Sequence, residues 1–171
     1  MYLDEESKNF KYDMEYGIYT IQSESEIPKE LIEDKYTFYV KINGKDIKDY
    51  EFDYMDITQN AFLFHTKDCV GWRDRYLDWM GDLSWLYYNG KENTGYKNII
   101  LVFEHWDEVG KGFFSNGQKL RDKILEDFME EEGIFSILAI EDEDFIWVDG
   151  TPSYIEDYEP AFKVFNIYLI P

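Results

Sequence analysis

The chain has 171 residues, enough for one domain whose core needs neither disulfides nor metals. Apolar residues make up 44% of it and aromatic residues 19%, which excludes a disordered acidic chain. The 17 Lys and Arg residues against 37 Asp and Glu residues give a formal net charge of −20. That charge argues against direct binding to DNA, RNA or an anionic membrane, and it favours a basic protein partner or mimicry of a nucleic acid.

The sequence carries no signal for export or for a membrane. Cys69 is the single cysteine, so no internal disulfide can form, which fits a reducing compartment. Residues 1–13 are acidic and lack the apolar stretch of a signal peptide. No stretch approaches the roughly 18 consecutive apolar residues of a membrane span. We therefore expect a cytoplasmic protein that does not contact a membrane.

The first third of the chain predicts a helical turn followed by a strand. Residues 1–35 are rich in Glu, Asp, Ser and Tyr and end in the turn-like IPKELIEDK. Residues 36–42 alternate aromatic and β-branched side chains and stop at an Asn-Gly turn, which is the pattern of a strand. The run at 50–57 fits either the second strand of a hairpin or the start of a helix, and the sequence does not decide between them.

Residues 72–87 predict one amphipathic helix with an acidic front. Asp74, Asp78 and Asp82 are spaced four apart, so they lie within an arc of about 80°. Trp85 projects into the same arc and adds an aromatic side chain to the acidic front. The opposite side carries the apolar residues expected to face a core, Trp72, Tyr76, Met80 and Leu83.

This acidic stripe has two interpretations. A chain so rich in Asp and Glu shows such stripes by chance, and a run of charge is usually a solvated face. Like charges at this spacing, however, weaken an isolated helix by a few tenths of a kcal/mol per pair. A stripe that weakens its own helix favours a cationic partner, and charges beside an aromatic residue are a common composition for a protein-binding hot spot.

The second half of the chain predicts strands that alternate with a helix. The apolar run at 98–103 is typical of a buried strand in a parallel sheet. A helix opens at the Ser-Asn-Gly sequence 115–117 and runs to about residue 132, and the apolar run 135–140 is interpreted as another buried strand. The buried row of the helix is formed by Leu120, Ile124 and Phe128. This alternation predicts an α/β fold with a parallel sheet.

The tail contains two further strand candidates, at 145–149 and 162–170. They would form an edge hairpin on the sheet or a small cover over one of its faces. We accordingly divide the chain into an N-terminal extension (1–35), a central domain (36–140) and a C-terminal extension (141–171) that packs on the same domain.

Four segments of the central domain stand out together: VKINGKDI, DRYLDWMGDLSWL, IILVFEHWDEV, and NGQKLRDKILEDFMEEEG running into FSILAI. In order and approximate spacing they resemble the barstar family of ribonuclease inhibitors and immunity proteins. The resemblance covers residues 36–140 and implies a barstar-like fold, a small parallel β-sheet packed with helices. It also implies an intracellular inhibitor that blocks the active site of a basic ribonuclease toxin and does not itself bind nucleic acid.

The resemblance also implies which residues meet the nuclease. Asp78 matches the family's central aspartate and Asp74 matches its companion one turn earlier; both would take the place of RNA phosphates at the nuclease's cations. The nearest match to a contributing glutamate on the later helix is Asp127, with Glu126 or Glu130 as candidates if the register slips. Together with the front of the first helix, the expected partner-binding residues are Asp74, Asp78, Asp82, Trp85 and Asp127.

The chain departs from the family beside these residues. Trp72 and Arg73 stand where the family usually has an Asn and an aromatic residue, and Asp68 replaces a contact tyrosine. Arg73 and Arg75 also place positive charge beside the acidic stripe. These departures predict a nuclease partner that differs from the prototype's.

Other classes of function have weaker support in the sequence. Pairs of carboxylates could serve acid–base chemistry, but acidic residues in loops and at strand ends are commonplace in this chain. The two histidines have no ligand-spaced partner and the cysteine has no catalytic motif around it. We expect neither an enzyme nor a bound metal or cofactor.

Two alternatives to the inhibitor remain open. An acidic nucleic-acid mimic would antagonise a DNA- or RNA-binding protein through charge spread over an extended face, and it would tolerate the loss of any single aspartate. An inhibitor that plugs an active site should instead concentrate its binding energy in Asp78 and its neighbours. The resemblance could also be architectural only, because a fold does not imply a function.

Overall fold

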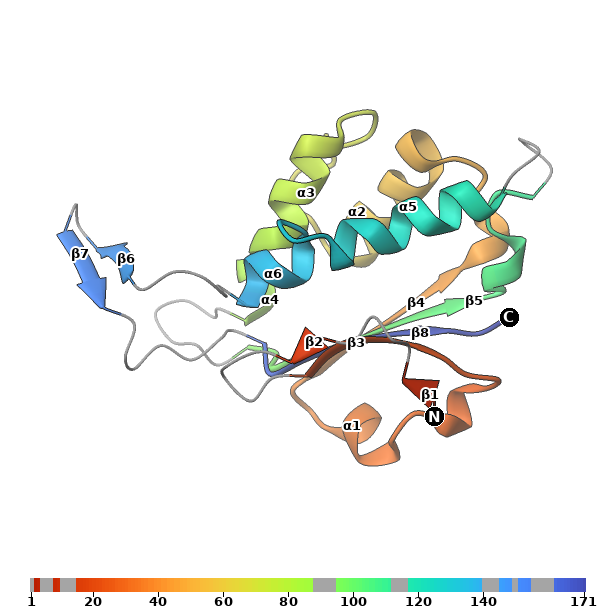
Figure 1. Ribbon diagram of the computed structural model, residues 1–171, viewed down its shortest axis with the longest axis horizontal. Coiled ribbons are helices and arrows are strands. Elements are labelled where there is room, and N and C mark those ends of the chain that lie inside the picture. Colours follow the sequence, from red (N-terminus) through yellow and green to blue (C-terminus); the bar gives the residue numbers. More distant parts are fainter. Residues whose placement is uncertain are drawn as a thin grey trace.

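The computed structural model shows an α/β fold built on one mainly parallel sheet (Figure 1). It describes residues 2–3, 8–9, 15–87, 95–111, 117–139, 145–148, 151–154 and 162–171. Four parallel strands lie side by side in the order β3 (Glu15–Thr20), β8 (Val164–Leu169), β5 (Asn98–Glu104) and β4 (Thr37–Asn43). Two short strands pair antiparallel with β3, namely β1 (Tyr2–Leu3) and β2 (Lys8–Asn9).

Helices cover both faces of this sheet, and one helical layer is much thicker (Figure 1). The thin side carries η1 (Glu24–Glu26) and α1 (Lys29–Glu33), which connect β3 to β4. The thick layer contains α2 (Met55–Ala61), α3 (Arg73–Asp82), α4 (Ser84–Tyr87), α5 (Gly117–Met129) and α6 (Ile134–Ala139). Shorter helical turns are η2 (Gly44–Asp46), the π-helix η3 (Tyr50–Tyr54) and η4 (Trp106–Glu108).

The central strand β5 shows why the sheet needs cover on both faces. Its first six residues are all buried, as expected for an apolar strand in the middle of a parallel sheet. Ile99, Leu101 and Phe103 belong to the large core under the thick helical layer. Ile100 and Val102 belong to a smaller core on the α1 side. The alternation of strand side chains therefore divides the interior into two cores.

Several predictions from the sequence are confirmed. The α/β class with a parallel sheet is correct, and the strands expected at 36–42 and 98–103 are β4 and β5, which pair along their whole length. The turn expected before residue 36 is α1. The undecided run at 50–57 is helical, because Asp49 accepts hydrogen bonds from the backbone N–H groups of Phe52 and Asp53 and so caps η3.

The strand predicted at 135–140 is wrong, because residues 134–139 form the helix α6. Ile134, Phe135, Leu138 and Ala139 are buried, whereas Ile137 is 46% exposed. This spacing follows one face of a helix rather than the alternation of a strand. The apolar run 135–140 is too short to show a helical or a strand period, so the prediction of a strand rested only on the length of the run.

The division of the chain at residues 36 and 140 does not match the sheet. β3 comes from the supposed N-terminal extension and β8 from the supposed C-terminal one, yet they pair with each other in parallel. β8 also pairs with β5, so the expected edge strand at 162–170 lies inside the sheet. The other tail candidate is β6 (Phe145–Val148), which pairs antiparallel with β7 (Thr151–Tyr154) in a separate two-stranded sheet.

The helices in the described part of the chain are short or amphipathic. None of them is long and apolar enough to cross a lipid bilayer.

Candidate functional site

The acidic stripe of α3 lies on the outside of the thick helical layer. Asp74, Asp78 and Asp82 are all exposed, and all three belong to the same helix, as predicted. Asp82 accepts a hydrogen bond of 3.1 Å from the Ser84 hydroxyl. Within the described ranges, Asp74 and Asp78 have neither a hydrogen bond nor an ion pair from their carboxylates. Asp74 and Asp78 can therefore offer their carboxylates to a partner without first breaking internal contacts.

The back of α3 fixes its orientation on the core. Tyr76, Met80 and Leu83 are fully buried, as their position opposite the stripe predicts. Trp72, the fourth residue expected there, is instead 56% exposed. Its backbone is extended because it precedes the first helical residue, so the helical periodicity does not apply to it.

The helix predicted over residues 72–87 is interrupted at Leu83. Leu83 adopts the left-handed conformation, with φ of 48°, and its N–H donates to the Trp79 carbonyl over 3.2 Å, which ends α3. The chain then restarts as α4. Because of this break, Trp85 does not extend the acidic stripe along a continuous helix.

Trp85 packs against other aromatic residues of the thick helical layer, which its predicted role on the acidic front did not include. Its indole Nε1–H donates to the Phe62 carbonyl over 2.9 Å. Its ring centroid lies 5.6 Å from that of Phe64 and 5.3 Å from that of Trp79. Trp85 is thus partly buried in an aromatic cluster, and its indole N–H is already hydrogen bonded. Its contact with a partner stays a prediction.

Asp127, expected to contact the partner, is fully buried. Its Oδ1 accepts a hydrogen bond of 2.7 Å from Arg73 Nη2, and its Oδ2 accepts one from the Tyr50 hydroxyl. Helical periodicity places it next to Phe128 on the inner side of α5 rather than on the outer side. In this structure Asp127 therefore joins elements of the thick layer to one another and does not face solvent. Glu126 and Glu130, the two alternatives to Asp127, do have exposed side chains.

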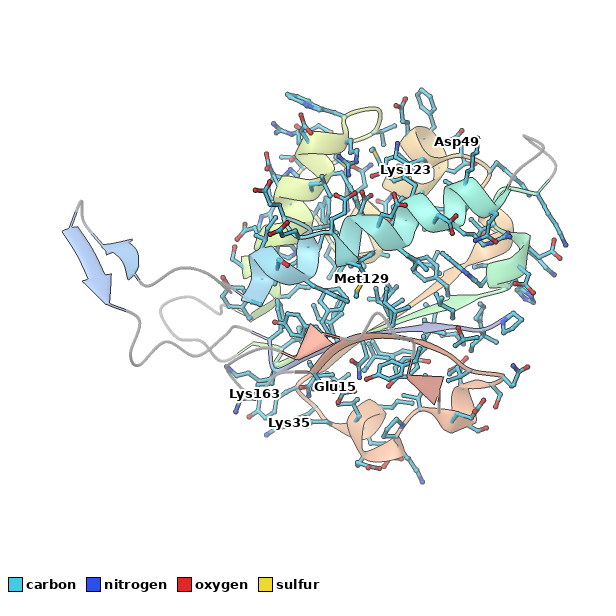
Figure 2. All side chains as sticks on the ribbon, viewed as in Figure 1. Glu15, Lys35, Asp49, Lys123, Met129 and Lys163 are labelled. Carbon is cyan, nitrogen blue, oxygen red and sulfur yellow. The ribbon has the colours of Figure 1, made fainter. Side chains whose placement is uncertain are left out.

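Burial dominates the electrostatics around Asp127. It raises the pKa of the Asp127 carboxyl, while the hydrogen bonds from Tyr50 and Arg73 oppose that rise. Burial and the neighbouring carboxylate also raise the pKa of the Tyr50 hydroxyl, which therefore acts as a donor. The Lys123 ammonium lies 4.2 Å from the centre of the Tyr50 ring, and Figure 2 labels Lys123 on the helical side of the sheet. η3, α3 and α5 thus meet at one polar cluster.

The two arginines of α3 do not neutralise its acidic stripe. Arg73 pairs with Asp127 and also lies 3.6 Å from Glu130, on α5 and just beyond it. Arg75 Nη2 lies 2.6 Å from Asp68 Oδ2, in the loop before α3. Each guanidinium therefore has a carboxylate partner outside the helix. The partners are 54 and 7 residues apart in the sequence, so neither pair has the spacing of three or four residues by which an ion pair within a helix is predicted.

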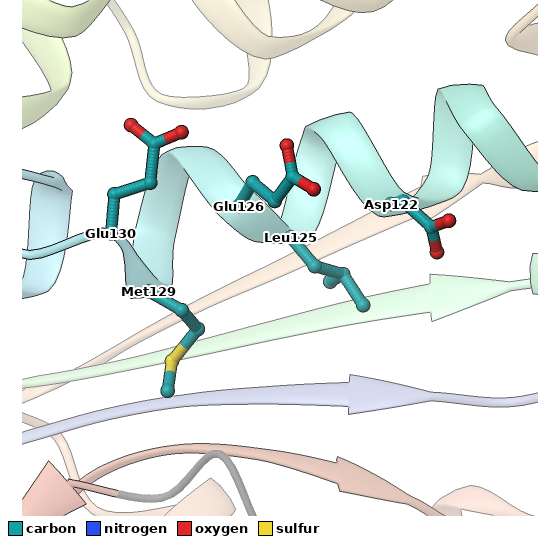
Figure 3. A pocket seen from close by; sticks show the side chains of 5 residues that line it. All are labelled: Asp122, Leu125, Glu126, Met129 and Glu130. Carbon is teal, nitrogen blue, oxygen red and sulfur yellow. The ribbon is translucent and has the colours of Figure 1, made fainter.

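A second acidic surface lies on α5, around a hollow of about 330 Å³ (Figure 3). Leu125 and Met129 point from the helix toward the sheet, whereas the carboxylates of Glu126 and Glu130 point away from it. Asp122 completes the lining among the described residues. The hollow is small and bordered by negative charge, so it suits part of a basic surface rather than an acidic ligand.

The described residues offer no set of three His, Cys, Asp or Glu side chains placed to hold a metal ion. Cys69 is buried, and its thiol hydrogen bonds to Gln59 Oε1 over 3.1 Å. Burial raises the pKa of that thiol, which makes it a poor nucleophile. The ring of His65 packs on Trp85 with 5.4 Å between centroids. The contacts of Cys69 and His65 are therefore those of residues that pack within the fold.

The exposed carboxylates of α3, each free of the adjacent arginines, form the candidate site. Its geometry suits a basic protein surface, because fixed carboxylates can accept charge-assisted hydrogen bonds from Arg and Lys. No family model matches this chain, and comparisons with curated proteins and with solved structures likewise found no match.

Proposed function

We propose that this chain is an inhibitor that binds a basic ribonuclease and occupies its active site with the acidic stripe of α3. The observation that carries the proposal is that Asp74, Asp78 and Asp82 are exposed on one helix while both neighbouring arginines pair elsewhere. A ribonuclease active site is a basic concave pocket that binds phosphates. Carboxylates at fixed helical spacing can replace those phosphates at its cations.

Pre-organisation supports this role for α3. Its inner residues are fully buried, and Arg73 ties its first turn to α5 through Asp127. Little conformational entropy is then lost from the helix when a partner binds, so more of the interaction energy contributes to affinity. The net charge of −20 accelerates encounter with a basic partner at low salt. The resemblance of residues 36–140 to the barstar family agrees with this proposal, and with action in the cytoplasm against a toxin.

The test is a titration of the purified protein against a panel of basic bacterial ribonucleases, including any nuclease encoded beside its gene, with RNA cleavage as the readout. We expect stoichiometric inhibition of one of them. Asp78→Asn should weaken binding by about 30-fold, the effect of losing one hot-spot contact. The matched control is Glu33→Gln, which removes one charge from α1 on the other side of the sheet and should leave inhibition unchanged.

The second candidate is a nucleic-acid mimic, and the acidic surface on α5 favours it. Asp122, Glu126 and Glu130 extend the exposed negative charge beyond α3. A mimic should bind DNA- or RNA-binding proteins with strong salt dependence and should retain that binding in Asp78→Asn. Failure to inhibit any ribonuclease, together with such binding, would overturn the inhibitor and support the mimic.

A further inference from the structure

Large apolar side chains are exposed in η3 and in the segment just before α3. Phe52 is 62% exposed, Trp72 is 56% exposed and Val70 is also exposed. We call these three residues, two aromatic and one aliphatic, the aromatic platform. The Gly71 N–H donates to the Glu51 carbonyl over 3.0 Å, which joins the segment that carries Val70 and Trp72 to the segment that carries Phe52. Phe52 and Trp72 thus lie on two segments that a backbone hydrogen bond joins, and a partner that covered them would remove apolar surface from water.

Trp72 is ordered although it is exposed. Its N–H donates to the Cys69 carbonyl over 2.8 Å and its carbonyl accepts from the Tyr76 N–H over 3.1 Å. The Arg75 guanidinium lies 5.4 Å from the centre of its ring, within range of a cation–π contact. Arg75 is in turn fixed by two contacts with Asp68, of 2.9 Å from Nε and 2.6 Å from Nη2. The indole therefore has a supported position before any partner arrives.

Phe52 is presented by a capped element. It lies in the π-helix η3, whose first turn is closed by the Asp49 carboxylate accepting from the Phe52 and Asp53 N–H groups. π-helical turns are uncommon and are frequently found at functional sites. Gly71, with φ of 79°, allows the turn that brings the chain back to Glu51. Both aromatic residues thus stand on backbone that is fixed by hydrogen bonds.

We propose that the aromatic platform is the second part of the partner-binding surface. On the proposed function, on which this inference rests, the partner would then carry an apolar side chain next to its cations. Trp72 precedes Asp74 by only two residues, so the platform adjoins the start of the acidic stripe. Tryptophan and arginine are enriched among the residues that dominate protein interfaces. The stripe would supply charge complementarity and the platform would select among basic partners.

Two peptides of equal length and charge test this, one alternating arginine with leucine and the other arginine with glycine. Their binding to the full chain is followed by the backbone amide signal of Asp78 and the indole signal of Trp72 in NMR spectra. We expect both peptides to shift Asp78 and only the leucine peptide to shift Trp72. The leucine peptide should bind about tenfold more tightly, since burying one leucine side chain supplies enough free energy for that ratio.

The double variant Phe52→Ser, Trp72→Ser should remove this preference while Asp78 still shifts with both peptides. Both replaced side chains are largely exposed, so the fold is retained, which circular dichroism checks. Tyr36→Ser is the matched control, because Tyr36 is an exposed aromatic residue that lies just before β4 and outside the platform. It should keep the preference of the wild type.

The outcomes separate the two proposals. Equal binding of the two peptides by the wild type, or a preference that survives in the double variant, would overturn the aromatic platform and leave the acidic stripe intact. Absence of any shift at Asp78 would overturn cation binding by α3, and with it both the inhibitor and the platform.

Discussion

The Arg73 guanidinium donates a 2.7 Å hydrogen bond to the fully buried carboxylate of Asp127 and thereby ties the start of α3 to the inner side of α5. This contact has two consequences. It gives a buried charge its partner, and it removes the positive charge of Arg73 from the stripe on the outer side of α3. One ion pair therefore supports both the packing of the helical layer and the negative potential of the candidate site.

Arg73→Met should lower the free energy of unfolding by about 2–3 kcal/mol, because it leaves the buried carboxylate with one partner fewer. The value is set below the roughly 3–5 kcal/mol of a fully buried pair, since the Arg73 side chain is 38% exposed and water can partly replace it. Urea denaturation measures the change. Arg75→Met, which breaks a more exposed pair, should cost less than about 1 kcal/mol, and an equal loss in both variants would contradict a special role for the Arg73 pair.

Asp127 predicts a pH dependence with a definite sign. Burial raises its native pKa above the ordinary value of 3.8, so the native state binds the proton more tightly than the unfolded chain does. Its contribution to stability is then fully present below pH 3.8 and is lost as the pH rises through the raised native pKa. The free energy of unfolding of the wild type minus that of Asp127→Asn should therefore fall as the pH rises through this window. A difference that grows with pH would mean that Arg73 outweighs burial.

Asp78→Asn should stabilise the free protein while it weakens binding. Asp78 has a like charge four residues away on each side, and removing both repulsions should raise the free energy of unfolding by about 0.5 kcal/mol. Glu33→Gln has the opposite expectation, because it removes the favourable pair with Lys29 at the same spacing. Thermal unfolding at low salt compares them. A destabilised Asp78→Asn would show that this carboxylate has a structural role.

Arg75→Ala should release the indole of Trp72 without unfolding the protein. The guanidinium that lies over the ring is lost, and with it the link to Asp68. The heteronuclear NOE of the Trp72 indole N–H should fall, whereas that of the Trp85 indole, whose N–H is bonded to the Phe62 carbonyl, should stay constant. An unchanged NOE for Trp72 would mean that the backbone alone orders this side chain.

Several helices and strands could be predicted from the sequence, because the periodicity of apolar residues within a segment indicates its type and its buried side. The alternation at 36–42 and the apolar run at 98–103 correspond to β4 and β5, and the row Leu120, Ile124 and Phe128 faces inward from α5. The stripe of α3 is exposed for the same reason, since its opposite side is apolar. The apolar run at 135–140 is too short to show its period, and it forms α6 rather than a strand.

The sequence by itself determined the acidity, the parallel α/β class and the exposed row of Asp74, Asp78 and Asp82. Tertiary structure alone decided that Asp127 is buried, that Trp72 is exposed and that both arginines turn away from the stripe. It also placed β8 beside β3, joining the two ends of the chain in one sheet. The physical reason is that periodicity specifies which side of an element faces a core, whereas contacts between residues far apart in the chain depend on which elements pack together.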